Sequence, residues 1–197
     1  TNTLKYGGFV DKLEYFDNEY FGLTKFQAKS TDPQQRMLLE SSVKAIYDSN
    51  QTLESIKEEP IGVFIGITEY QFDKFVKDYS VGGLGHFFSA NRISYCLGLT
   101  GPSLSIDTGC SSSLVALDTA LKNVIYGTCQ KAIVAGVNIR LEGIPSENTP
   151  DMFSEHCRCK TFDSDGSGFV RSEGCVSIVI EKEKTEYAYA KIKGINV

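Results

Sequence analysis

The stretch "DTGCSSSLVALDTAL" at residues 107–121 places a thiol, Cys110, directly before three serines and an apolar helical pattern. The residues just before it, "SLSI" at 103–106, predict a strand. The segment therefore predicts a strand, a tight turn that carries Cys110, and a helix from Cys110 to about Tyr126. Apolar residues occupy so much of this helix that we expect it to be covered on more than one face.

Helices and apolar strands alternate on both sides of this segment. Asp32 is suited to cap a helix over 33–49, with Pro33 at its first position. The apolar runs "IGVFIGI" and "KAIVAGVNI" are typical of buried strands. The remaining predicted elements are helices over 72–79 and 86–98 and strands within 168–182 and 187–197, whereas residues 1–31, 81–85 and 140–167 are predicted to be irregular. This alternation predicts an α/β layered domain.

The overall composition excludes several classes of protein. Of the 197 residues, 41% are hydrophobic and 23% are charged, which is typical of a globular domain or part of one. The net charge of -5 argues against a general nucleic-acid binder. No apolar run is long enough for a transmembrane helix, so we expect no membrane partner. The N-terminus lacks both an initiator Met and the apolar core of a signal peptide, which indicates a processed chain or part of a longer one.

The cysteine pattern favours a reducing, cytoplasmic setting. The six cysteines, at 96, 110, 129, 157, 159 and 175, do not form evenly spaced pairs. A chain of this length also does not need a disulfide scaffold. We therefore expect mostly free thiols.

Three other motifs are weak candidates for metal or cofactor binding. His156, Cys157 and Cys159 are spaced too tightly for an ordinary structural zinc site. The run "DSDGSG" at 163–168 resembles the start of a calcium loop, but Gly174 stands where the bidentate Glu is required. The run "GGLG" is too short for a dinucleotide fingerprint. We therefore predict no metal and no directly bound cofactor.

Cys110 is the candidate nucleophile. A helix N-terminus offers unpaired N–H groups and a partial positive charge, and both favour thiolate over thiol. Ser111, Ser112 and Ser113 are small enough to leave room for a substrate. The alternative is that Cys110 is a small buried hydrophobe beside a serine-rich cap. A thiol nucleophile also needs a proton-transfer partner, and the flanks of the two histidines, His86 and His156, give neither one a catalytic pattern.

Several segments in the same order carry a resemblance to a known family. The run "DTGCSSSLVA" resembles the active-site segment of β-ketoacyl synthases, the condensing domains of polyketide and fatty acid synthases. The segments "FDNEYFGLT", "DPQQRMLLE", "GVFIGI", "ANRISYCLGLTGPSLSIDT", "AIVAGVN", "CKTFD" and "GFVRSEGC" are also similar to family segments. The resemblance covers essentially the whole chain and is closest to the ketosynthases of modular type I polyketide synthases.

The resemblance implies a fold and a reaction. The fold is a thiolase-like α-β-α-β-α arrangement of two similar halves. Residues 1–197 would be a partial domain, mostly the N-terminal half, without the first strand and the C-terminal half. Cys110 would accept an acyl group from the phosphopantetheine arm of an acyl carrier protein domain. A malonyl-type extender would then lose carbon dioxide and attack this thioester, while the Cys110 N–H contributes to an oxyanion hole.

The resemblance further implies a homodimer in which the strand at 103–106 runs along the interface; the alternative is an interior strand. The family uses two histidines in later segments, and neither His86 nor His156 matches them. Gly109 stands where the family commonly has Ala, and "SEHCRCK" departs from the usual loop sequence.

Three functional hypotheses follow. The first is that the chain is part of an active condensing domain. By itself this part would be inactive and prone to aggregate, because its apolar faces and strand edges stay uncovered. The second is a truncated, non-catalytic relative that serves as a binding or dimerisation module. The third is another thiol acyltransferase of the thiolase superfamily, against which "DPQQR" and "CKTFD" count.

Overall fold

A mixed four-stranded sheet lies at the centre of the computed structural model, which describes residues 7–76, 85–142, 153–154, 156–183 and 185–197. The strand order is β2-β1-β3-β4. β1 pairs in parallel with β2 and β3, and β4 runs antiparallel to β3. The strands are β1 (Gly62–Gly66), β2 (Ser103–Ile106), β3 (Lys131–Asn138) and β4 (Gly174–Glu181).

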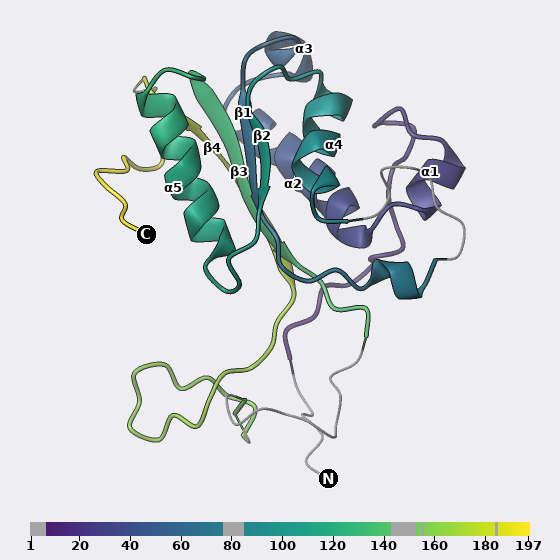
Figure 1. The fold of residues 1–197 in the computed structure, drawn as a ribbon, viewed down its shortest axis with the longest axis vertical. Coiled ribbons are helices and arrows are strands. Elements are labelled where there is room, and N and C mark those ends of the chain that lie inside the picture. Colours follow the sequence, from purple (N-terminus) through teal and green to yellow (C-terminus); the bar gives the residue numbers. More distant parts are fainter. Residues whose placement is uncertain (1–6, 77–84, 143–152, 155, 184) are drawn as a thin grey trace.

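Helices cover both faces of this sheet, as Figure 1 shows. α2 (Pro33–Asp48) and α4 (Phe88–Leu97) lie on one face, and α5 (Ser112–Ile125) lies on the other. The resulting α-β-α layers confirm the predicted α/β class. Shorter elements are α1 (Lys25–Lys29), α3 (Leu53–Ile56) and the 3₁₀ turn η1 (Phe72–Lys74).

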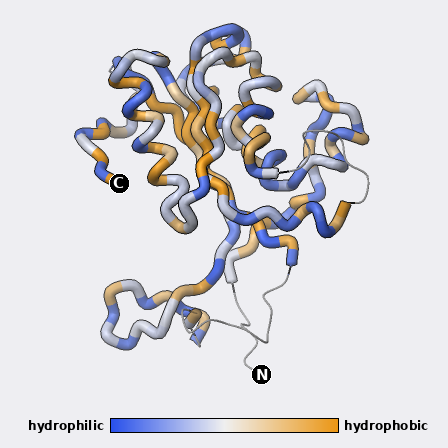
Figure 2. The backbone as a smooth tube through the Cα atoms, viewed as in Figure 1, coloured by the Kyte–Doolittle hydropathy of each residue, from blue (hydrophilic) through white to orange (hydrophobic). Residues whose placement is uncertain are grey.

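The apolar strand runs are explained by burial on both faces. Successive side chains of a strand point to opposite faces. Val63 and Ile65 therefore pack in the cluster with α2 and α4, and Phe64 packs in the cluster with α5. All three side chains are inaccessible to solvent. Figure 2 shows the same concentration of hydrophobic residues along the central strands.

The predicted helix ends follow their local chemistry. Asp32 caps α2, because its Oδ1 accepts a hydrogen bond from the Gln34 N–H at 2.7 Å. Pro33 is the first helical residue, where its missing N–H costs nothing. α4 ends at Gly98, which adopts the left-handed conformation with φ of 68°. The helix predicted over 86–98 is thereby confirmed.

Some predicted boundaries were wrong. The N-terminal region contains α1, whose start is a capping box formed by Thr24 and Gln27. α3 begins with a similar box that was also missed. The helix predicted over 72–79 is present as η1, and its residues 77–79 lie outside the described part of the chain, as does most of the loop at 81–85.

The last predicted strand is also wrong. Residues 187–197 form no strand and are mostly exposed. A strand requires a neighbour to accept and donate its backbone hydrogen bonds. In the part of the chain that the structure describes, no strand lies beside this segment. The alternation of Tyr187 and Tyr189 with small residues therefore did not suffice to make one.

One apolar surface remains open to solvent on the α5 side of the sheet. Leu114 and Ile125 on α5 are 52% and 59% exposed. On β4, Val176 and Ile178 are 68% and 41% exposed, and they pair with β3 residues that face α5. Within the described residues, α5 is thus covered on its sheet side only, and the predicted second cover is not seen there.

The described part of the chain contains no helix that is both long enough and apolar enough to cross a lipid bilayer.

Candidate active site

The carboxyl ends of three strands meet at one edge of the sheet. β1, β2 and β3 are parallel, so the residues that follow them lie together. Thr68 and Glu69 follow β1, the Cys110 turn follows β2, and Arg140 follows β3. In open α/β sheets this edge is the usual position for a ligand site.

Cys110 lies on an exposed turn between β2 and α5, as the sequence predicted. Gly109 adopts φ of 66°, a left-handed conformation that glycine reaches without strain. The Gly109 N–H donates to Asp107 Oδ1 at 3.0 Å, and the Thr108 N–H donates to Ser112 Oγ at 2.9 Å. The helix begins at Ser112, so Cys110 precedes it by two residues.

The serines after Cys110 have a packing role that sequence reasoning missed. α5 approaches the sheet so closely that a Cβ on Gly66 would lie 2.4 Å from the Ser113 backbone nitrogen. A Cβ on Gly136 would lie 2.8 Å from the Ser113 Cβ. Ser112 is also 96% buried. Small residues on α5 and on the facing strands therefore allow the helix to pack closely on the sheet. The serines thus contribute to this packing as well as leaving room for a substrate.

The environments of the other cysteines separate them from Cys110. Burial raises the pKa of the Cys96 and Cys129 thiols, and it raises that of Cys175 to about 11. These three thiols are therefore protonated at neutral pH. Cys110 and Cys159 are exposed. The exposure of Cys110 contradicts the alternative that it is a small buried hydrophobe.

Neither histidine joins Cys110 in the described structure. The His86 ring packs edge-on against Tyr70 at 5.6 Å, and its Nδ1 is buried without a hydrogen-bond partner among the described residues. His156 is exposed. No hydrogen bond links either imidazole to Cys110 in the described part of the chain. The same residues contain no group of three or more His, Cys, Asp or Glu side chains that could hold a metal ion.

An ion-pair cluster lies at the same sheet edge and was not predicted. The Glu69 carboxylate accepts from Arg140 Nη1 at 2.8 Å and from Arg171 Nη1 at 2.9 Å. The Arg171 guanidinium also lies 4.7 Å above the Phe153 ring. Glu173 accepts from the Arg140 backbone N–H at 2.9 Å. The signal in the sequence was the presence of charges directly after two apolar strands.

Replacing Glu69 by glutamine is expected to lower the free energy of unfolding by about 1–3 kcal/mol, because Arg140 and Arg171 lose their shared counter-charge. The Arg140 side chain is 9% exposed, so water replaces little of the lost interaction. The measurement is urea denaturation of the full-length protein. Glu142→Gln is the matched control, since its pair with Lys74 is exposed and should contribute no more than about 1 kcal/mol. Equal effects of the two substitutions would contradict the prediction.

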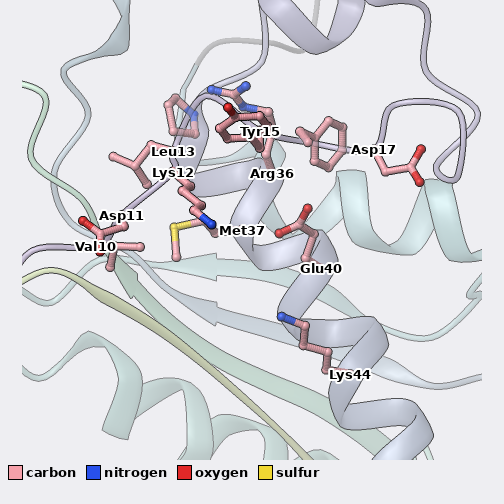
Figure 3. Close-up of a pocket in the computed structure, with 12 residues that line it drawn as sticks. Val10, Asp11, Lys12, Leu13, Tyr15, Asp17, Arg36, Met37, Glu40 and Lys44 are labelled. Atoms are coloured by element: carbon pink, nitrogen blue, oxygen red, sulfur yellow. The ribbon is translucent and has the colours of Figure 1, made fainter.

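The described residues also form a hollow of about 400 Å³ away from Cys110. It lies between the outer side of α2 and the segment from Val10 to Asp17, as Figure 3 shows. Its α2 wall carries Arg36, Glu40 and Lys44. Cys110 is not among its lining residues, so this hollow is separate from the Cys110 turn.

Comparison with known proteins identifies the family. The model of the β-ketoacyl synthase N-terminal domain matches residues 1–186. Orsellinic acid synthase of Beauveria bassiana is 37% identical over 92% of this chain, and polyketide synthase PksL of Bacillus subtilis is 34% identical over 96%. The chain spans only 9% and 5% of the lengths of these two relatives.

Solved structures show the same relationship. The ketosynthase from module 6 of the bacillaene synthase of Bacillus subtilis matches 91% of this chain with a TM-score of 0.84 and 31% identity. An oxazolomycin ketosynthase domain of Streptomyces albus matches 88% with a TM-score of 0.77 and 27% identity. This chain covers 31% of each of those chains. The fold is therefore thiolase-like, and the chain belongs to the β-ketoacyl synthase family, of which it represents the N-terminal domain.

Proposed function

We propose that this chain supplies the nucleophile of a polyketide-type ketosynthase, an acyltransferase that forms carbon–carbon bonds by decarboxylative Claisen condensation. The observation that carries the proposal is the position of Cys110. It is an exposed thiol on a tight turn, between a parallel strand and the N-terminus of a helix, at the carboxyl edge of the sheet. The three cysteines whose pKa is raised, Cys96, Cys129 and Cys175, offer no comparable group, and Cys157 is buried.

The first step is transfer of an acyl group to Cys110. The Cys110 thiolate attacks the carbonyl carbon of a thioester on the phosphopantetheine arm of an acyl carrier protein, which acts as a substrate. A new sulfur–carbon bond forms, the old one breaks, and the carrier thiol leaves with the proton that Cys110 gave up. The Cys110 N–H would stabilise the oxyanion of the tetrahedral intermediate.

The second step is the condensation. A malonyl-type extender on a carrier arm loses carbon dioxide, and the resulting carbanion attacks the Cys110 thioester. The Cys110 thiolate leaves, so the chain is longer by two backbone carbons and the thiol is regenerated. Since no hydrogen bond links a histidine to Cys110 among the residues that the structure describes, we propose that other groups assist the decarboxylation.

Two exposed surfaces support the proposed partners. The apolar α5 and β4 surface, with Leu114, Ile125, Val176 and Ile178, is suited to a covering C-terminal half of the same domain. β2 is an edge strand in the described sheet, and Leu104 on it is 41% exposed. An edge strand can pair with its copy, so we propose that β2 lies along the interface of a homodimer. The six free cysteines favour the reducing setting of the cytoplasm.

The proposal is tested with the full-length gene product and, in parallel, with residues 1–197 alone. Each is incubated with an acyl-loaded and a malonyl-loaded carrier protein, and the carrier is examined by mass spectrometry. We expect a β-ketoacyl carrier from the full-length protein and none from residues 1–197. Hydrolysis of the acyl carrier without condensation would instead support another thiol acyltransferase. No acyl transfer to the full-length protein would support a non-catalytic relative, and a monomer in sedimentation would contradict the dimer.

A further inference from the structure

Two hydroxyl groups from different elements converge on one carbonyl beside the nucleophile. The Gly109 carbonyl oxygen accepts from Ser112 Oγ at 2.6 Å and from Thr68 Oγ1 at 3.1 Å. The two hydroxyls are also 3.1 Å from each other. Ser112 begins α5. Thr68 follows β1 and lies 44 residues from Ser112 in the sequence.

This carbonyl shares a peptide plane with the Cys110 N–H. The described chain has no cis peptide bonds, so the Gly109 carbonyl and the Cys110 N–H point in opposite directions within that plane. Hydroxyls that fix the direction of the carbonyl therefore fix the direction of the N–H as well. The Ser112 N–H also donates to this carbonyl at 3.1 Å, and the hydroxyls add to that support at a residue, glycine, that restricts the rotation of the neighbouring peptide less than any other.

We infer that Thr68 and Ser112 are positioning residues that hold the Gly109–Cys110 peptide, so that its N–H faces the oxyanion formed during acyl transfer. The inference rests on the proposed function and adds a residue, Thr68, that lies outside the nucleophile segment. The Ser112 Oγ also accepts from the Thr108 N–H at 2.9 Å, so this hydroxyl is hydrogen-bonded to two backbone groups of the turn, the Thr108 N–H and the Gly109 carbonyl. Thr68 connects this turn to the end of the central strand β1.

The test compares two reactions of the same thiol in the full-length protein. Transfer of an acetyl group from acetyl-pantetheine passes through an oxyanion, whereas alkylation by iodoacetamide does not. Thr68→Val keeps the shape of the side chain and removes the hydroxyl. We expect it to lower kcat for acyl transfer about fivefold to tenfold with little change in KM, because the N–H loses its orientation. The rate of alkylation of Cys110 should stay within about twofold of wild type, since the thiolate itself is unchanged.

Three further variants sharpen the result. Thr68→Ser retains the hydroxyl and should restore acyl transfer to within about twofold of wild type. Thr100→Val is the matched control, because the Thr100 hydroxyl donates to another exposed backbone carbonyl, that of Glu58, at 3.3 Å. It should change neither reaction. Ser112→Ala removes the shorter hydrogen bond and should slow acyl transfer more than Thr68→Val does.

The outcomes are distinct. Acyl transfer at the wild-type rate in Thr68→Val would overturn the inference, and so would an equal slowing of alkylation, which would indicate a general structural role. A wild-type protein whose Cys110 is alkylated but never acylated would overturn the proposed function itself, and the inference with it.

Discussion

Replacing Cys110 by alanine is expected to abolish acyl loading of the full-length protein, with a loss on the order of 10³-fold or more. Alanine has no nucleophilic atom, and in the described residues no second thiol shares the carboxyl edge of β1 and β2 with Cys110. The measurement is the mass increase of the protein after incubation with an acyl-loaded carrier. Because the side chain is exposed, the substitution should leave the fold and its melting temperature nearly unchanged.

Cys159→Ala is the matched control for this experiment. Cys159 is also exposed, and its Sγ accepts a hydrogen bond from the Val170 N–H at 3.3 Å. It lies in the loop segment before β4, so its loss should leave acyl loading unchanged. Loading that persists in Cys110→Ala and disappears in Cys159→Ala would move the nucleophile to that loop and refute the assignment of Cys110.

Replacing Gly66 by alanine is expected to lower the free energy of unfolding by about 3 kcal/mol. The added Cβ would lie 2.4 Å from the Ser113 nitrogen and 2.5 Å from the Ser112 carbonyl carbon. These are backbone atoms at the start of α5, so no side-chain rotation can relieve the contact. The helix must move away from β1, and we expect acyl loading to fall as well because the Cys110 turn moves with it.

Gly174→Ala is the control for the effect of an added methyl group in the same sheet. A Cβ at Gly174 meets no atom within 4 Å among the described residues. The substitution should change the free energy of unfolding by less than about 0.5 kcal/mol. Urea denaturation of the full-length protein measures both variants. A Gly66→Ala protein as stable as Gly174→Ala would show that α5 does not pack on β1 at the described distance.

Much of the architecture follows from local sequence. The capping of α2 by Asp32, the end of α4 at Gly98 and the strand at 103–106 all depend on short-range chemistry, and the structure confirms them. The candidate nucleophile was predictable for the same reason. A strand, a glycine turn and an apolar helix in succession place Cys110 at a turn without any knowledge of distant residues.

The predictions that were wrong or incomplete depend instead on contacts between residues that are distant in the sequence. The segment 187–197 has the alternation of a strand, but a strand exists only where a neighbour pairs with it. The role assigned to the three serines was incomplete, because their contact with Gly66 and Gly136 depends on how closely α5 approaches the sheet. The Glu69 cluster joins residues up to 102 positions apart. The charges after the two apolar strands indicate their positions at the sheet edge, but the local sequence does not identify which charges pair.

The sequence by itself therefore determined the α/β class, the family and the position of Cys110 on a turn, since each depends on residues close together in the chain. Only the tertiary structure decided which groups surround that turn. Thr68 reaches the Gly109 carbonyl because the parallel pairing of β1 with β2 brings the ends of both strands to one edge. Parallel strands are joined by long connections, so the groups that meet at their ends are distant in sequence and are brought together by the sheet alone.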